Sequence, residues 1–276
     1  MVGTEFGPFF IEKELGSGAM GAVYKARYLK NSQRVAIKVM NFAAGTNANS
    51  SLHARFEREA EILKNLNHGN IVRLFGVGRF KGMRYYAMEL IDGETLEEIK
   101  KRKGQFSWEE TIEIGIQVCS ALQAAHDQNI VHRDLKLPNL MMTSSGVVKL
   151  TDFGIAKDLE GTALTSAHCA IGTAAYMSPE QCKGERDISF KSDLYSLGVV
   201  LFEMMTGRRP FRGENAMELF LHHVQSKVEK PSRVNTDIPI WFDTLILHLM
   251  EKKPEHRPAS AAVVRTVLEE IREKMT

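Results

Sequence analysis

The chain has 276 residues, which at about 150 residues per domain allows one or two substantial hydrophobic cores. Hydrophobic residues make up 43% of the chain and charged residues 25%, so its composition is that of a globular protein and not of a disordered one. Lys and Arg number 36, against 34 Asp and Glu. The net charge of +2 lacks the basic excess of proteins that bind nucleic acid through phosphate contacts, so we expect no nucleic-acid partner.

The sequence shows no membrane span and no secretion signal. Its longest apolar stretch, Val199–Met205, contains Glu203 and falls far short of the roughly 20 residues that cross a bilayer. The N-terminus lacks a basic start followed by an apolar run, and Val2 excludes N-myristoylation. The 3 cysteines have spacings that indicate neither disulfides nor a zinc site. We expect a cytoplasmic protein, or the intracellular domain of a longer membrane-anchored one, with no membrane segment within this chain.

Short runs rich in Val, Ile and Tyr, separated by Gly, Asn and Ser, predict that the first part of the chain is mainly β-structure. The predicted strands are Phe9–Leu15, Gly21–Tyr28, Arg34–Met40, Ile71–Gly78 and Met83–Leu90. One predicted helix, Leu52–Leu66, interrupts them. This part is therefore expected to form a small β-rich lobe that contains one helix.

After Asp92 the pattern becomes helical. The helix Thr95–Lys103 begins with a capping box, and Ser107 with Glu110 forms the capping box of the next helix. Leu194–Met205 is apolar almost all round, as a central helix is. A small β-rich part followed by a larger helical part predicts an α+β fold with two lobes, about 1–91 and about 92–276.

Glycines in the first lobe form a candidate phosphate site. Gly16, Gly18, Gly21 and Val23 fit the pattern G-x-G-x-x-G-x-V, in which the backbone can approach phosphate oxygens. A dinucleotide-binding turn would open a helix, whereas the residues after Gly21 alternate like a strand, so these glycines are predicted to cap a hairpin. Lys38 lies near the end of the next strand and could bind phosphate. The alternative is a lysine at the edge of the strand whose ammonium group only reaches solvent.

The helix that follows supplies a partner for that lysine. Glu59 falls in the middle of its apolar stripe, and a carboxylate in an inward-facing position is costly unless it meets a cation. Lys38 is the obvious candidate. We infer an ion pair between Lys38 and Glu59 that aims the ammonium group at a bound polyphosphate.

Two polar motifs, His132–Asn139 and Thr151–Gly154, lie beside the apolar runs Ile130–Val131 and Val147–Leu150, which are predicted as strands. Such a group of residues suits phosphoryl transfer. One carboxylate can orient a hydroxyl group and a lysine can neutralise the phosphoryl group. An amide and a second carboxylate can hold divalent cations through oxygen.

In this order along the chain, the motifs resemble the signature set of the protein kinases, from about Phe9 to Ile271. The segments FGPFFIEKELGSGAMGAVYKA and IGTAAYMSPEQ are most similar to bacterial eukaryote-like (Hanks-type) Ser/Thr kinases. The resemblance implies one kinase domain over 1–276, with a small lobe of antiparallel sheet and one helix and a larger, mainly helical lobe. It also implies ATP as the cofactor and proteins with Ser or Thr as the substrates.

The resemblance assigns a role to each candidate residue. Asp134 matches the catalytic base and Lys136 the γ-phosphate lysine, while Lys38, with Glu59 as partner, matches the lysine that holds the α- and β-phosphates. The expected ligands of Mg²⁺, for which Mn²⁺ could substitute, are Asn139 and Asp152. The other expected ATP contacts are Gly16, Gly18, Gly21, Val23, Ala36, Met88, Glu89, Ile91 and Met141. Glu89 and Ile91 would use main-chain groups, and plain core packing is the alternative for Val23, Ala36 and Met141.

Downstream positions match structural and regulatory residues of the family. The expected structural residues are Asp193, as the buried anchor of a helix, and Glu180 with Arg257, as a buried ion pair. The expected regulatory residues are Arg133, Thr165 and Thr173. Phosphate on Thr165 would pair with Arg133, which predicts autophosphorylation at least partly between molecules; a merely flexible Ser/Thr-rich connection is the alternative. The resemblance to the bacterial kinases implies a homodimer in which this transfer occurs.

Two other functions are weighed against an active kinase. A kinase-fold scaffold without catalysis, a pseudokinase, would generally lack one of the lysine, base or metal positions, and all are present here. Its only support is Leu137, which stands where the family has proline, with Pro138 following. A small-molecule kinase would lack the peptide-docking segment represented by Gly172–Thr173 and Ser178–Glu180. The spacing from Asp134 to Asn139 is kept, so the ligand geometry is expected to survive.

Overall fold

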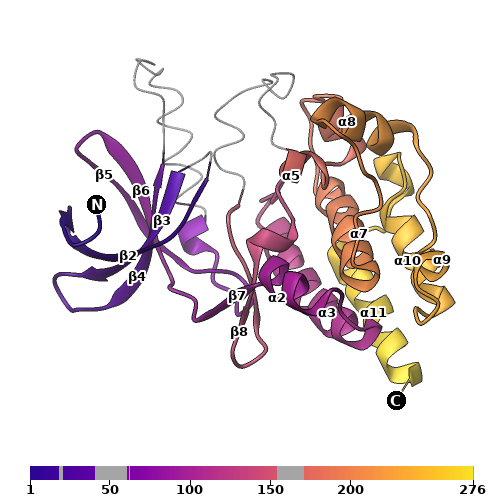
Figure 1. Ribbon diagram of the computed structural model, residues 1–276, viewed down its shortest axis with the longest axis horizontal. Coiled ribbons are helices and arrows are strands. Elements are labelled where there is room, and N and C mark those ends of the chain that lie inside the picture. Colours follow the sequence, from indigo (N-terminus) through magenta and orange to yellow (C-terminus); the bar gives the residue numbers. More distant parts are fainter. Residues whose placement is uncertain (19–20, 41–60, 62, 154–170, 276) are drawn as a thin grey trace. The chain divides into compact units, whose positions relative to one another are not determined.

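The computed structural model describes residues 1–18, 21–40, 61, 63–153 and 171–275 (Figure 1). By its internal contacts the described chain divides into two compact units, one of residues 1–92 and one that begins at Gly93. In this described part, no helix is long and apolar enough to cross a membrane.

The first unit is built on one antiparallel sheet with the strand order β1-β2-β3-β4-β6-β5 (Figure 1). Its strands are β1 (Glu5–Phe6), β2 (Phe9–Gly18), β3 (Gly21–Tyr28), β4 (Arg34–Met40), β5 (Leu74–Phe80) and β6 (Met83–Met88). One face of the sheet carries a cluster of aromatic and β-branched side chains. Within it, Phe6 and Phe9 both pack edge-on against Tyr85, with ring centroids 5.4 and 5.6 Å away.

The strands agree with the sequence prediction where the apolar runs are long. The predicted bounds of β3 and β4 are those observed, whereas β5 begins at Leu74 and not at Ile71. The two-residue strand β1 was not expected, because it is too short to show an alternating pattern. Most of the predicted helix Leu52–Leu66, including Glu59, lies outside the described residues.

The second unit combines a small three-stranded sheet, ordered β7-β8-β9, with a set of helices. Its strands are β7 (Gly93–Thr95), β8 (Leu140–Thr143) and β9 (Val148–Leu150). Its helices are α2 (Leu96–Lys103), α3 (Trp108–His126), α5 (Ile171–Ala174), α6 (Pro179–Cys182), α7 (Lys191–Thr206), α8 (Ala216–Gln225), α9 (Pro231–Val234), α10 (Ile240–Leu249) and α11 (Ala261–Met275), with 3₁₀ turns η1 (Leu137–Asn139) and η3 (Pro254–His256).

Both capping boxes predicted from the sequence are formed. The Thr95 side chain accepts from the Glu98 backbone N–H at the start of α2, and Ser107 does the same for Glu110 at the start of α3. Helix α7 is buried on all sides from Ser192 to Met205, which makes it the core of this unit. Any loop that forms hydrogen bonds with α7 is therefore held by the most buried helix of this unit.

The expectation of a strand at Ile130–Val131 is wrong. This pair lies in an irregular segment after α3, where the Ile130 N–H donates to the Ala125 carbonyl 3.0 Å away. The next two backbone N–H groups, of His132 and Arg133, donate to a side chain and not to a neighbouring strand. The two apolar residues are half-buried in this irregular segment and do not pair with a strand.

Candidate active site

In the first unit the glycine-rich segment forms the β2–β3 hairpin, as predicted, with Gly18 opposite Gly21. Gly21 is required by the fold itself. Its φ is +141°, and an added Cβ would lie 2.0 Å from the Val39 carbonyl oxygen. At Gly16 and Gly18 the described residues place no atom within 4 Å of an added Cβ. Packing thus explains Gly21, whereas the other two glycines leave the backbone open to an approaching group.

Lys38 lies on the sheet face opposite the aromatic cluster. Val35, Ile37 and Val39 of β4 belong to that cluster, and side chains alternate along a strand, so Ala36 and Lys38 point to the other face. Register brings more of the expected residues to this face. Val23 of β3 pairs with Lys38, and Met88 of β6 pairs with Ala36. Residues predicted to contact ATP therefore share one face of the sheet.

In the second unit a single carboxylate fixes the loop that carries the expected base. Asp193, on α7 and 1% exposed, accepts from the His132 and Arg133 backbone N–H groups, each at 2.8 Å. Its Oδ2 also lies 2.8 Å from Nε2 of His126, at the end of α3. Arg133 has a φ of +63°, a conformation that L-residues rarely adopt, and these bonds hold it there. Asp193 occupies the anchoring position that the resemblance implied.

His132 is fully buried and satisfied at both ring nitrogens. Nε2 lies 2.8 Å from the Thr151 carbonyl, which can only accept, and Nδ1 lies 3.3 Å from the Asp134 N–H, which can only donate. The neutral ring with its proton on Nε2 fits both partners. Desolvation by burial lowers the pKa of His132, although neighbouring carboxylates such as Asp193 oppose the shift. The neutral His132 ring thus links the loop that carries Asp134 to Thr151 through hydrogen bonds.

The expected base, Asp134, lies among the residues predicted to work with it. Lys136 Nζ contacts Asp134 Oδ2 at 2.8 Å and donates to Thr173 Oγ1 at 3.2 Å. The Asn139 side-chain amide donates to the Asp134 carbonyl at 2.8 Å and to its Oδ2 at 3.2 Å. The structure therefore brings together a carboxylate, a lysine, an amide and a hydroxyl group that come from two separate segments.

The Leu137–Pro138 order is accommodated locally. Leu137 is fully buried and Pro138 sits within the 3₁₀ turn η1, where its missing N–H is tolerated. The turn ends at Asn139, whose N–H donates to the Lys136 carbonyl at 3.0 Å. The altered order thus leaves the amide of Asn139 directed at Asp134.

The second polar motif is tied to the first through its backbone. Both the N–H and the hydroxyl group of Thr151 donate to the Asn139 carbonyl, at 2.9 and 3.1 Å. Asp152 has a φ of +56°, and the Phe153 ring packs 4.7 Å from the His132 ring. The hydrogen bonds of Thr151 thus hold the backbone next to Asp152 against the Asn139 loop. Separately, Met141 lies on β8, where it pairs with Thr95 of β7.

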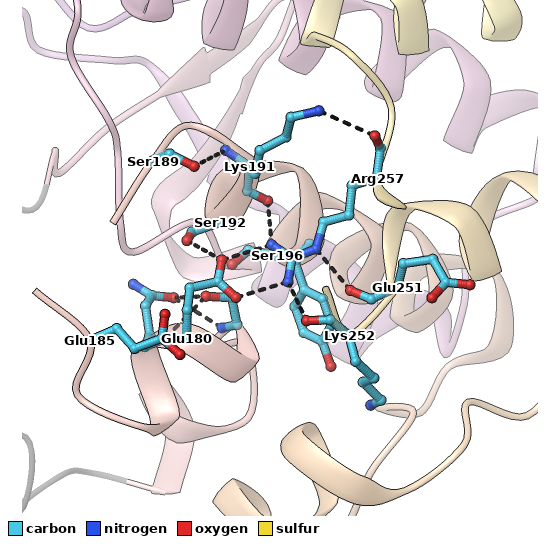
Figure 2. Close-up of polar contacts among 12 residues, drawn as sticks. Glu180, Glu185, Ser189, Lys191, Ser192, Ser196, Glu251, Lys252 and Arg257 are labelled. Atoms are coloured by element: carbon cyan, nitrogen blue, oxygen red, sulfur yellow. Dashed lines mark hydrogen bonds and ion pairs between the residues drawn. The ribbon is translucent and has the colours of Figure 1, made fainter. Parts of the chain in front are cut away.

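Glu180 and Arg257 form the buried ion pair that was expected (Figure 2). Arg257 donates twice to the Glu180 carboxylate, at 2.7 and 2.8 Å, and its other N–H groups reach the carbonyls of Lys191, Lys252 and Glu251. Burial alone would raise the pKa of Glu180, but Arg257 and the Ser192 hydroxyl hold it below its ordinary value. The pair fixes α6 to the start of α7.

Two positioning residues were missed by sequence reasoning. His126 supports Asp193 as described, and the Gln181 side-chain amide donates to the Arg133 carbonyl at 2.9 Å while its oxygen accepts from the Ser178 N–H. The spacing of Ser178 and Gln181 is a capping-box signal that could have indicated the second residue. Glu59 and Thr165 lie outside the described residues, so their predicted roles stay predictions.

Comparison with known proteins identifies the class. A family model described as the protein kinase domain matches residues 9–268. A probable serine/threonine-protein kinase of Clostridium perfringens is 40% identical over 258 residues, which cover 94% of this chain and 37% of that protein. The serine/threonine-protein kinase PrkC of Bacillus subtilis is 38% identical over 255 residues, covering 92% and 39%. The crystal structure of the Mycobacterium tuberculosis PknI kinase domain has a TM-score of 0.77 and 25% identity, covering 98% of both chains.

The chain belongs to the protein kinase family. The predicted resemblance to bacterial Ser/Thr kinases and the predicted α+β kinase fold are both confirmed. Members of this family transfer phosphoryl groups from ATP with the help of divalent metal ions, and a kinase domain implies protein substrates. The chain spans less than half the length of the curated relatives described above.

Proposed function

We propose that this chain phosphorylates Ser and Thr residues of proteins, using ATP and Mg²⁺. The observation that carries the proposal is the group around Asp134, in which one carboxylate is held by Lys136 and Asn139 beside the Thr173 hydroxyl. The fixed Asp134 would accept the proton of a substrate hydroxyl, and Lys136 would neutralise charge on the transferring group. The names of the bacterial relatives, which are Ser/Thr kinases, support the same substrate class.

Asn139 and Asp152 suit Mg²⁺ by the chemistry of their donors. The Asn139 amide nitrogen is directed at Asp134, which leaves its carbonyl oxygen as the acceptor for another partner, and Asp152 adds a carboxylate. Magnesium prefers oxygen ligands and completes its coordination with phosphates and water. Bound there, the ion would supply charge neutralisation for the phosphates, with Mn²⁺ as a substitute.

On the first unit, the sheet face that carries Lys38 is proposed to bind the nucleotide. Its phosphates would meet Lys38 and the open backbone at Gly16 and Gly18. Ala36 and Met88, on the same face, would contact the adenine, and the backbones of Glu89 and Ile91 would pair with its edge. The remaining apolar contacts are proposed to come from Val23 and Met141.

Regulation is proposed to occur through Thr165, which lies outside the described residues. Its phosphate would pair with Arg133, and autophosphorylation would proceed between two molecules of a homodimer. Peptide mapping after incubation with MgATP tests this. We expect phosphate on Thr165 and slower phosphorylation of added substrate by Thr165→Ala. An active enzyme with no phosphate between residues 161 and 167 would contradict the proposal.

The proposed function is tested with γ-labelled ATP and two general protein substrates, one basic and one acidic. We expect labelled phosphoserine or phosphothreonine with the wild-type chain in Mg²⁺ or Mn²⁺, and none in EDTA. The matched control is Asp134→Asn, which preserves the size of the side chain and removes the base. Equal labelling by a folded Asp134→Asn protein would overturn the assignment, and no labelling by the wild-type chain would favour a pseudokinase.

A further inference from the structure

Away from the residues assigned above, Glu203 is a buried carboxylate shared by two cations. It lies on α7 with its side chain 3% exposed. Its Oε1 contacts Lys100 Nζ, from α2, and Arg209 Nε at 3.6 Å. The Tyr176 hydroxyl donates to its Oε2 at 2.5 Å. One negative charge therefore faces two positive charges.

The tyrosine does not cancel the surplus charge. Burial, followed by the charge of Glu203, raises the pKa of Tyr176 far above its ordinary value, so the group remains a neutral O–H donor. Arg209 stays protonated, because Tyr176 and Glu203 outweigh the opposing effect of burial on its pKa. The cluster of Lys100, Glu203, Arg209 and Tyr176 thus carries a net positive charge.

Both cations remain partly open to solvent. The Lys100 side chain is 17% exposed and the Arg209 side chain 30% exposed. Glu97 also acts on Arg209, but it forms its own ion pair with Lys101 at 3.0 Å. An additional anion could therefore approach Arg209 from the solvent side. Glu203 neutralises the positive charge of Arg209 only in part, because it also pairs with Lys100.

The cluster is connected to the proposed catalytic group by a short turn. Tyr176 lies three positions after Thr173, and its N–H donates to the Thr173 carbonyl at 3.2 Å. Thr173 contacts Lys136, and the Arg209 guanidinium lies 5.1 Å over the Tyr176 ring. Because an extended peptide advances about 3.3 Å per residue, the few residues that flank a phosphoacceptor bound at Asp134 could span the one turn of chain between Thr173 and the Tyr176–Arg209 contact.

We propose that Lys100 and Arg209 form a subsite that selects substrate peptides with Asp or Glu within about four residues of the phosphoacceptor Ser or Thr. This inference rests on the proposed function and deepens it. The same charge disfavours peptides with Lys or Arg at that position. Glu203 has a supporting role, because it holds Lys100 and Arg209 side by side. The Glu203 carboxylate is itself buried and therefore kept away from the substrate.

The test uses threonine peptides that are identical except for Glu, Gln or Lys placed in turn at each position on either side of the phosphoacceptor. At one or two neighbouring positions, we expect Glu to lower KM by up to about fivefold relative to Gln, the upper end of what an exposed ion pair contributes, with kcat unchanged. Arg209→Gln should remove this difference between the Glu and Gln peptides. Arg209→Lys should retain it.

The matched control is Arg208→Gln, since Arg208 is the adjacent arginine and pairs one-to-one with Glu229 at 2.6 Å. This variant should keep the preference for Glu. Raising ionic strength should weaken that preference in the wild-type chain, a readout that does not depend on the folding of a variant. Equal KM for the Glu and Gln peptides at every position would overturn the inference while leaving the proposed function intact. So would a preference that persists in the double variant Lys100→Gln/Arg209→Gln. Phosphorylation of no peptide at all would refute the proposed function itself.

Discussion

Replacing Glu180 by Gln should strongly destabilise the protein, because it leaves a buried guanidinium without its counter-charge. The Arg257 side chain is fully enclosed and that of Glu180 is 5% exposed. Gln preserves the volume and one hydrogen-bond acceptor but removes the negative charge. Breaking a buried pair by removing one partner costs about 3–5 kcal/mol.

The expected loss corresponds to a fall in Tm of about 10 °C, since a domain of this size loses about 2–4 °C per kcal/mol. Thermal unfolding followed by circular dichroism measures it. Glu94→Gln is the matched control, because Glu94 also pairs with two nitrogens of one arginine, Arg102, but on the surface. That control should leave Tm almost unchanged.

The pH dependence gives a second measurement. The pKa of Glu180 lies below its ordinary value of 4.5, so the stability that its charge contributes is fully present above that value. It is lost as the pH falls through the folded-state pKa. The gap in stability between wild type and Glu180→Gln should therefore be constant near neutrality and close in acid. A drop in Tm no larger than that of Glu94→Gln, or a gap that does not change in acid, would refute the reasoning.

Three further outcomes are expected. Asp152→Asn should lower phosphoryl transfer at least as much as loss of the base does, because positioning and charge neutralisation dominate this reaction; wild-type turnover by the folded variant, measured with labelled ATP, would contradict it. Lys38→Met should reduce turnover far more than Tm, whereas an unfolded variant would favour a purely structural role. Lys252 has a pKa lowered to about 8 from 10.5, chiefly by burial. Between these values the unfolded chain holds the proton and the folded chain does not, so wild-type stability should rise with pH relative to Lys252→Met in chemical denaturation; a flat difference would argue against the shift.

Local signals in the sequence predicted the elements whose formation depends on nearby residues. The capping boxes at Thr95 and Ser107 lie where the pattern placed them, and β3 and β4 have their expected bounds. The resemblance to kinases supplied the positions around Asp134. Each of these motifs can be recognised within about ten consecutive residues of the chain.

Contacts between distant segments could not be predicted in this way. Lys100 and Glu203 are 103 positions apart, and nothing in the α2 sequence distinguishes this lysine from its exposed neighbours. His126 likewise meets Asp193 only because α3 and α7 pack together. The strand β7 has three residues, too few to show periodicity. Packing, and not local pattern, determines all of these features.

The attachment of the catalytic loop to Asp193 also has a consequence for local stability. Irregular segments commonly open far more easily than the core, and their amide protons then exchange with solvent. Here the amides of His132 and Arg133 are bonded to a carboxylate on the fully buried helix α7. Their exchange requires either rupture of these bonds or unfolding of the helix itself. These two amides are therefore expected to exchange more slowly than those of an ordinary irregular segment, although the loop that presents Asp134 contains no regular secondary structure at that point.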